Sequence, residues 1–275
     1  MTVSQAQKYP MTWEQAVDWL REQPDQTPLV RACFFDDPLL EAARRYHAGS
    51  EWSAVRELLP RLPGIALDVG AGRGIASYAL ASDGWTTTAL EPDPSLLVGA
   101  EAIRTMAAEG ELPITVVTDF GERMPFRDES FDVVHARQVL HHARDLEHLC
   151  REFRRVLKPG GTFIATREHV VDKESDLAGF LDAHPLHHLY GGENAFPLSR
   201  YLSALTRAGL EITTILSPWE TDINLYPATL DDIRLSLARH LRFPFPRLIP
   251  TWYVHWASRR QTSPGRLYTF AGRRP

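Results

Sequence analysis

The sequence predicts an α/β protein built on a mostly parallel, doubly wound sheet. Short apolar runs alternate with helical stretches between residues 65 and 166, and the first apolar run ends in a glycine-rich turn. Strands that alternate with helices in this way form parallel sheets with helices on both faces. Ligands of such sheets bind at the carboxyl ends of the strands, so the residues that follow each strand are the candidates for a functional site.

Each expected strand is a short apolar or β-branched run between turn signals, and each expected helix has apolar residues at helical spacing. The expected strands span 65–69, 85–90, 114–117, 131–136, 162–166, 210–216 and 266–271. The expected helices span 75–81, 94–108, 146–157, 172–183, 198–208 and 230–241. We therefore assign residues 61–275 to one domain, with insertions at about 168–209 and 217–265.

Residues 1–60 are expected to form a helical N-terminal addition. Thr12 and Gln15 have the spacing of a capping box before an amphipathic helix, and further helices are expected at 38–47 and after Ser50. The sequence leaves open whether these helices only pack against the main domain or form a lid over a ligand site.

Composition excludes several classes of protein. The chain has 275 residues, of which 44% are hydrophobic, a composition typical of a globular protein. Its net charge of −5 disfavours a protein that binds nucleic acid. Two cysteines rule out a disulfide framework, residues 1–10 lack a signal-peptide pattern, and no run approaches the ~18 apolar residues of a membrane span. We expect a cytoplasmic protein. Residues 239–260 are basic and aromatic, which leaves peripheral membrane contact open, although their aromatic side chains are expected to pack into the domain.

The most specific motif is Asp68-Val69-Gly70-Ala71-Gly72-Arg73-Gly74, between the first strand and a helix. Glycines at alternate positions allow a sharp turn and close approach to a ligand. The third glycine of a dinucleotide-binding fingerprint would fall on Ile75, so the spacing argues against NAD(P). The carboxylate of Asp68 favours a ligand with positive charge over a pyrophosphate.

Two further features follow the second and third strands. Glu91 lies at the end of the second strand, where an acid can accept both hydroxyl groups of a ribose. Asp119 and Phe120 follow the third strand and offer an acceptor and an aromatic face to an adenine. Three such features in order, each after its own strand, predict a nucleoside-containing ligand.

With these motifs the sequence resembles the class I S-adenosylmethionine-dependent methyltransferases, of the small-molecule, methyltransferase-11-like type. The matching segments are LDVGAGRG (67–74), ALEPD (89–93), TDFGERMPFRDESFDVV (118–134), VLHH (139–142) and VLKPGG (156–161). The resemblance implies a Rossmann-like sheet of seven strands whose last strand is antiparallel. It also implies S-adenosyl-L-methionine as cofactor, bound by Asp68, Gly70, Ala71, Gly72, Glu91, Pro92, Asp119, Phe120, Arg137 and Gln138.

Methyl transfer to oxygen requires a general base, and histidine is the usual candidate. His141 and His142 follow the fourth strand, His169 follows the fifth, and His187 lies in a histidine-rich loop at 184–194. The sequence does not decide which of the four, if any, is the base, because each can instead have a structural or substrate-shaping role. The loop is expected to shape an acceptor pocket, with an ordinary loop or a metal site as alternatives; its spacing matches no closed zinc pattern, so no metal is assigned.

We therefore expect methyl transfer to a small-molecule or glycan acceptor, with oxygen as the favoured atom. The alternatives are a non-catalytic scaffold that binds S-adenosylmethionine, or methylation of RNA or protein. The fourth strand ends in ARQVLHH and lacks the Pro-Pro-aromatic motif of amino-methylating nucleic-acid enzymes, which disfavours nucleic acid. The acceptor and the oligomeric state stay open.

Overall fold

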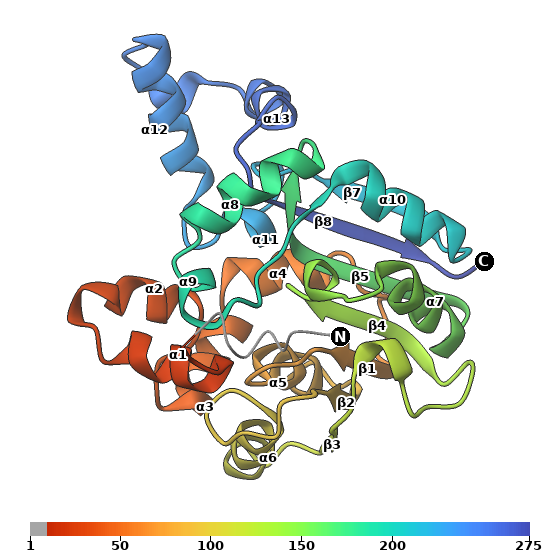
Figure 1. Ribbon diagram of the computed structural model, residues 1–275. Helices are drawn as coiled ribbons and strands as arrows, with labels where there is room; N and C mark the ends of the chain where they lie inside the picture. Colours follow the sequence, from red (N-terminus) through yellow and green to blue (C-terminus); the bar gives the residue numbers. More distant parts are fainter. Residues whose placement is uncertain (1–9) are drawn as a thin grey trace.

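The computed structural model describes residues 10–275 and confirms the predicted α/β architecture (Figure 1). The strands are β1 (Ile65–Val69), β2 (Thr86–Leu90), β3 (Ile114–Val117), β4 (Phe131–Arg137), β5 (Leu157–Val171), β6 (Phe196–Pro197), β7 (Glu211–Leu216) and β8 (Arg266–Arg273). They form one sheet in the order β3-β2-β1-β4-β5-β8-β7, with β6 paired to β5 outside this path. β1 to β5 are parallel, and β8 runs antiparallel between β5 and β7. The predicted seven-stranded sheet is therefore present, with a two-residue strand added.

The helices cover both faces of the sheet. They are α1 (Trp13–Arg21), α2 (Thr27–Ala32), α3 (Leu39–His47), α4 (Ser50–Arg56), α5 (Ile75–Ser82), α6 (Ala100–Glu109), α7 (Leu146–Val156), α8 (Leu177–Ala183), α9 (His187–Tyr190), α10 (Leu198–Arg207), α11 (Asp222–Leu225), α12 (Leu230–Leu241) and α13 (Thr251–Arg259). Residues 1–9 lie outside the described residues. The expectation that residues 1–10 lack a signal peptide falls almost wholly on this segment.

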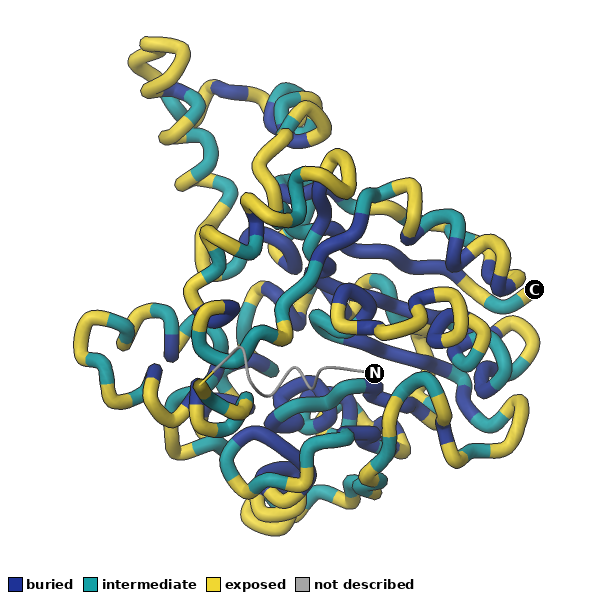
Figure 2. The backbone as a smooth tube through the Cα atoms, viewed as in Figure 1, coloured by how far each residue is buried: buried dark blue, intermediate teal, exposed yellow. Residues whose placement is uncertain are grey.

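Alternating strand residues separate two apolar cores. Leu67 and Val69 of β1 pack with α7 and α10 on one face, whereas Ala66 packs with α3, α4, α5 and α6 on the other. β4 divides in the same way, because Val134 joins the first core and Val133 the second. This period of two is the expected behaviour of a strand covered on both faces. Figure 2 shows the resulting buried interior along the sheet.

Several predicted boundaries are wrong. β5 continues to Val171, five residues past its expected end, so His169 lies on the strand and not after it. α8 begins at Leu177 and not at residue 172. α6 begins at Ala100 and not at residue 94, because Asp93 starts a turn in which its side chain accepts the Ser95 N–H at 2.8 Å. β5 begins at Leu157, five residues before the expected strand. Its glycine-containing start pairs with the C-terminus, where the Gly160 N–H donates to the Arg274 carbonyl at 2.8 Å.

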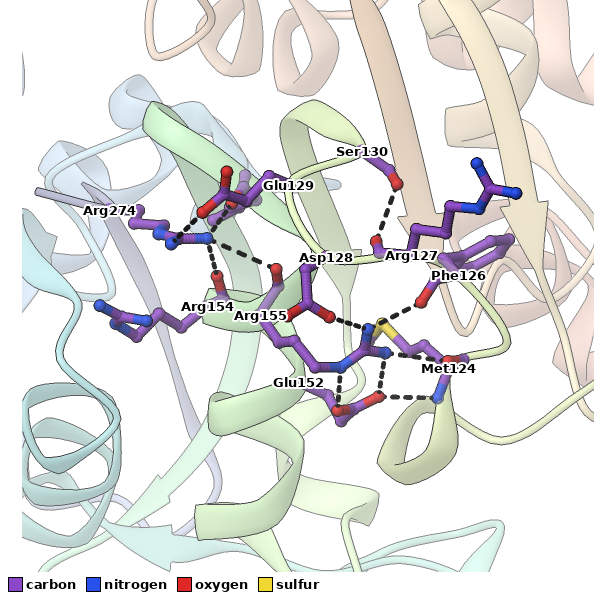
Figure 3. Close-up of polar contacts among 11 residues, drawn as sticks. Met124, Phe126, Arg127, Asp128, Glu129, Ser130, Glu152, Arg154, Arg155 and Arg274 are labelled. Atoms are coloured by element: carbon purple, nitrogen blue, oxygen red, sulfur yellow. Dashed lines mark hydrogen bonds and ion pairs between the residues drawn. The ribbon is translucent and has the colours of Figure 1, made fainter.

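Arginine side chains fasten the C-terminus and the segment before β4 to α7 (Figure 3). The Arg274 guanidinium donates to the Leu157 carbonyl at 2.6 Å and pairs with Glu129 at 2.6 Å. Arg155 of α7 pairs with Glu152 at 2.6 Å and Asp128 at 2.9 Å. These contacts fix the end of the sheet opposite the predicted site.

The N-terminal helices both pack on the domain and flank the carboxyl edge of the sheet. Trp52 of α4 and Tyr46 of α3 are buried in the second core. α1 contacts the segment around α9, where Trp13 lies 4.7 Å from Tyr190 between ring centroids. These helices therefore pack against the domain, and their role as a lid stays a prediction.

An arm formed by residues 230–260 extends from the body of the molecule, at the top of Figure 1. Its aromatic side chains were expected to pack into the domain, and this is wrong: Trp252 is 69% exposed and Phe245 60%. The arm closes a small core of its own around Ala238, Ile249 and Val254, which leaves its outer side chains uncovered. Among the described residues, no helix combines the length and apolarity that crossing a bilayer requires.

Candidate active site

A cavity of about 530 Å³ lies at the carboxyl ends of β1, β2, β4 and β5. The glycine-rich turn, the end of β2 and Phe120 line one side of it. The N-terminal helices, three histidines and the segment 184–193 line the other. Of the predicted site residues, only Asp119 and His187 are not among its lining. The structure therefore brings the predicted cofactor and catalytic residues to one place.

The glycine-rich turn needs its glycines for two different reasons. Gly70 and Gly72 both have positive φ, +60° and +55°, which favours glycine over other residues. A Cβ at Gly70 would lie 2.7 Å from a methyl group of Val139, whereas a Cβ at Gly72 would meet nothing within 4 Å. Gly70 thus allows the turn to pack closely against Val139, whereas the absence of a side chain at Gly72 leaves open space in the cavity wall.

Asp68 is buried at the end of β1, and both carboxylate oxygens already have partners. Oδ2 accepts the Ser77 hydroxyl at 2.6 Å, and Oδ1 lies 2.8 Å from Nδ1 of His135 on the neighbouring strand β4. These bonds tie β1 to β4 and to α5 directly below the glycine-rich turn. Sequence analysis did not identify His135, because a histidine inside an apolar strand carries no local signal of its partner.

Glu91 follows β2, as predicted, and its carboxylate organises the turn beside it. It accepts the N–H of Gly72 at 2.7 Å and that of Asp93 at 2.9 Å. Burial raises the pKa of Glu91 to about 7, although these backbone N–H groups oppose the shift. Pro92, the next residue, also lines the cavity.

The predicted adenine end is only partly assembled. The Phe120 ring lines the cavity, is half exposed, and has the Arg144 guanidinium 5.5 Å from its centroid. Asp119 accepts the N–H of Phe120 at 2.8 Å and faces Arg123 at 3.7 Å. The role expected for Asp119 stays a prediction.

Arg137 ends β4 and is held by an acid from the N-terminal addition. Its Nε donates to Oε1 of buried Glu51 at 2.7 Å, and Arg167 lies 3.8 Å from the other oxygen of the same carboxylate. Burial alone would lower the pKa of Arg137, but the Glu51 carboxylate raises it above its usual range. Gln138 has a positive φ of +58° and accepts from Arg137 at 3.1 Å. Sequence analysis missed Glu51, which looks like any charged residue in a helix.

The histidines that follow β4 and lie on β5 meet at the far side of the cavity. The ring centroids of His141 and His169 are 4.7 Å apart. Nδ1 of His141 lies 2.7 Å from the buried carboxylate of Glu168, and Nδ1 of His169 lies 2.7 Å from the Gly265 carbonyl. Burial lowers the pKa of both rings, to about 3 for His169, so both are neutral.

The other two predicted catalytic histidines, His142 and His187, lie in different places relative to the cavity. His142 is exposed, lines the cavity, and has its Nδ1 2.9 Å from the Gly192 carbonyl. His187 is buried in α9 and does not line the cavity, while its neighbour His184 does. The predicted histidine-rich loop thus reaches the site through His184 and Glu193.

Comparisons with known proteins agree with this geometry. Residues 67–165 match the family model described as a methyltransferase domain. A ubiquinone biosynthesis O-methyltransferase from Methylobacterium nodulans is 37% identical over 99 residues, which cover 36% of this chain and 39% of the relative. A 27-O-demethylrifamycin SV methyltransferase from Amycolatopsis mediterranei is 31% identical over 150 residues, covering 53% of each chain. The chain therefore spans about half or less of the length of these relatives.

Solved structures share the fold over a longer stretch. A geranyl diphosphate C-methyltransferase from Streptomyces coelicolor A3(2) has a TM-score of 0.61 and 15% identity, covering 88% of this chain and 84% of the other. The cyclase SpnF has a TM-score of 0.56 and 22% identity, covering 85% and 82%. Residues 67–165 thus resemble a methyltransferase domain, and the geranyl diphosphate C-methyltransferase of similar fold was solved with S-adenosyl-L-homocysteine.

Proposed function

We propose that this protein transfers a methyl group from S-adenosylmethionine to a small-molecule or glycan acceptor, with oxygen as the receiving atom. The observation that carries the proposal is that one cavity holds both a nucleoside-type binding surface and a histidine cluster. The fold, the family match and the O-methyltransferases among the relatives support it.

The residues on the first side of the cavity suit this cofactor chemically. Glu91 offers carboxylate oxygens to ribose hydroxyl groups, and Gly72 presents open space where any other residue would place a Cβ. Phe120 offers an aromatic face for an adenine. Because Glu51 neutralises Arg137, that guanidinium does not leave an unpaired positive charge beside a cationic ligand.

The bound cofactor supplies a methyl group already activated on a sulfonium sulfur, so placing the acceptor in line supplies most of the remaining rate gain. The protein must then remove a proton from an acceptor hydroxyl. Among the four predicted bases, His142 best suits this task, because it is exposed and lines the cavity. Burial lowers the pKa of His141 and His169, which makes both weaker bases, and His187 does not line the cavity.

A non-catalytic role in binding the cofactor is the second candidate. The cyclase SpnF has this fold and is not named a methyltransferase, so the fold by itself does not imply methyl transfer. Only turnover separates the two candidates, because both predict cofactor binding. Methylation of RNA or protein has no observation of this kind in its favour.

The test is a calorimetric titration with S-adenosylmethionine, S-adenosylhomocysteine and NADH, followed by a labelled-methyl screen of hydroxylated acceptors. We expect micromolar binding of the first two ligands, no binding of NADH, and transfer to at least one acceptor. His142→Ala should bind the cofactor as the wild type does and transfer methyl about 10²- to 10⁴-fold more slowly, the range for loss of a general base. Binding without transfer across the screen would favour the scaffold.

We further propose that the arm (residues 230–260) contacts an anionic membrane surface. Residues 239–260 contain five arginines and no acidic residue, in a chain whose net charge is −5. Trp252, Phe245 and Leu248 are more than half exposed on the same arm. Exposed aromatic side chains beside arginines suit the interface of an anionic bilayer.

A further inference from the structure

We propose that His141, His169 and Glu193 form a binding site for one divalent first-row transition-metal ion at the acceptor side of the cavity. One potential ligand atom from each residue lies within 4.8 Å of those of the other two. The residues come from three separate parts of the fold: the 3₁₀ helix η4 (Leu140–His142), β5, and the segment that follows α9. All three line the cavity.

The two rings are oriented as metal-binding histidines are. A carbonyl oxygen can only accept, so His169 donates from Nδ1 to Gly265 and its neutral ring keeps an unprotonated Nε2. Glu168 already accepts the N–H groups of Val139 and His141 at 3.0 Å each, and its carboxylate also accepts from Nδ1 of His141. A carboxylate or carbonyl on the second nitrogen is the usual support of a metal-bound histidine. Both rings thus have Nε2 available to an ion.

Glu193 supplies the third ligand and a negative charge. Its side chain is buried, and Oε1 accepts a hydrogen bond from the Tyr190 hydroxyl. The other oxygen lies 3.7 Å from Nε2 of His184, beyond the length of a good hydrogen bond. This oxygen is therefore placed to bind an ion that also contacts the two rings, and the charge of the carboxylate suits a cation.

The donor set selects the class of ion. Two imidazole nitrogens and one carboxylate favour Zn²⁺, Fe²⁺, Co²⁺ or Mn²⁺ over Mg²⁺ and Ca²⁺, which prefer oxygen ligands. Bonds of about 2.1 Å place cis ligand atoms roughly 3 Å apart, so the side chains must draw together by about 1–2 Å on binding. Three protein ligands leave coordination positions open for an oxygen of a bound molecule.

The metal site does not depend on the proposed function, but it would define the class of acceptor more closely. If the protein is a methyltransferase, the ion favours acceptors that bind a metal through an ionisable oxygen, because a bound cation lowers the pKa of that oxygen. The histidine cluster would then hold and activate the acceptor, while His142 remains free of the ion.

The test is a titration of the chelator-treated full-length protein with Co²⁺ alone, followed by visible absorption, and with Zn²⁺ alone in competition with a chelating indicator. We expect one ion per chain, ligand-field bands typical of nitrogen and oxygen donors, and a higher melting temperature with Zn²⁺. Glu193→Gln should weaken binding at least tenfold, and so should His169→Ala.

The controls separate loss of ligands from loss of the fold. Glu193→Gln keeps the size of the side chain and an acceptor for Tyr190, so it is expected to melt as the metal-free wild type does. His188→Ala changes a histidine of the same loop that faces the Asp182 carbonyl, and it should bind Co²⁺ like the wild type. Absence of saturable one-to-one binding, or equal binding by wild type and Glu193→Gln, would overturn the site. Because no cofactor is present in this titration, failure of the proposed methyl transfer would not affect its outcome.

Discussion

The two halves of the cavity are built in different ways. The cofactor half comes from one continuous stretch, residues 68–138, in which the contributing residues lie at or after the carboxyl end of a strand of the same sheet. The acceptor half combines the N-terminal helices, the residues after β4, β5 and the segment 184–193. Strand order positions most of the first half. The second depends on contacts between segments distant in the sequence, such as that of His142 with the Gly192 carbonyl, and the Glu51–Arg137 ion pair joins the two halves.

This contrast predicts that Glu51 carries a larger share of stability than any residue of the glycine-rich turn. Glu51→Gln leaves Arg137 buried without its partner, and Arg167 loses a nearby charge. We expect the free energy of unfolding to fall by about 3–5 kcal/mol, measured by urea denaturation. Glu57→Gln, which changes an exposed residue at the C-terminal end of the same helix, is the matched control. A loss below about 0.5 kcal/mol would show that the N-terminal helices do not depend on this pair.

The cofactor half should show its own pH dependence through Glu91. Because the folded pKa is raised from 4.5 to about 7, this group contributes stability below pH 4.5 that is lost as the pH rises through 7. The loss is at most about 3 kcal/mol. The free energies of unfolding of the cofactor-free wild type and of Glu91→Gln should therefore converge or cross as the pH is raised from 5 to 8. A stability difference that is constant across this range would contradict the assignment.

The two glycines test the local geometry of the same half. Gly70→Ala combines a positive φ with a 2.7 Å contact to Val139, whereas Gly72→Ala has the strain alone. We expect about 1 kcal/mol of destabilisation for Gly72→Ala and clearly more for Gly70→Ala, compared by thermal unfolding. Gly72→Ala should still abolish most cofactor binding, because its methyl group enters the cavity. Normal affinity in Gly72→Ala would place the cofactor elsewhere.

The smallest effect on stability is expected in the arm. Trp252→Ser removes an exposed ring and should change the free energy of unfolding by less than about 0.5 kcal/mol. It should reduce co-sedimentation with vesicles that contain anionic lipid, whereas Leu62→Ser, at another exposed apolar position, should not. Equal co-sedimentation of both variants and the wild type would contradict the proposal that the arm contacts an anionic membrane surface.

The same contrast explains what the sequence could predict. β1, β3 and α12 lie where hydrophobic periodicity placed them, and the glycine-rich turn and Glu91 occupy the predicted edge of the sheet. Period and turn chemistry are local properties, so one sequence suffices for them.

The acceptor half was less predictable for physical reasons. Helices α2 and α9 have six and four residues, too short for a helical period to stand out. Glu51 is buried only because two distant arginines meet it, and its neighbours in the sequence do not signal this. The histidine-rich loop was identified, but which of its residues face the cavity depends on how α9 turns.

The most direct test of the account measures S-adenosylmethionine affinity by calorimetry in the wild type, Glu91→Ala and Glu193→Gln. The account predicts that Glu91→Ala weakens binding by about 1–2 kcal/mol, or roughly 5- to 30-fold, as expected for hydrogen bonds to a charged group. Glu193→Gln should bind the cofactor as the wild type does, because Glu193 belongs to the acceptor half. Unchanged affinity in Glu91→Ala, or an equal loss in both variants, would contradict the division of the cavity into two halves.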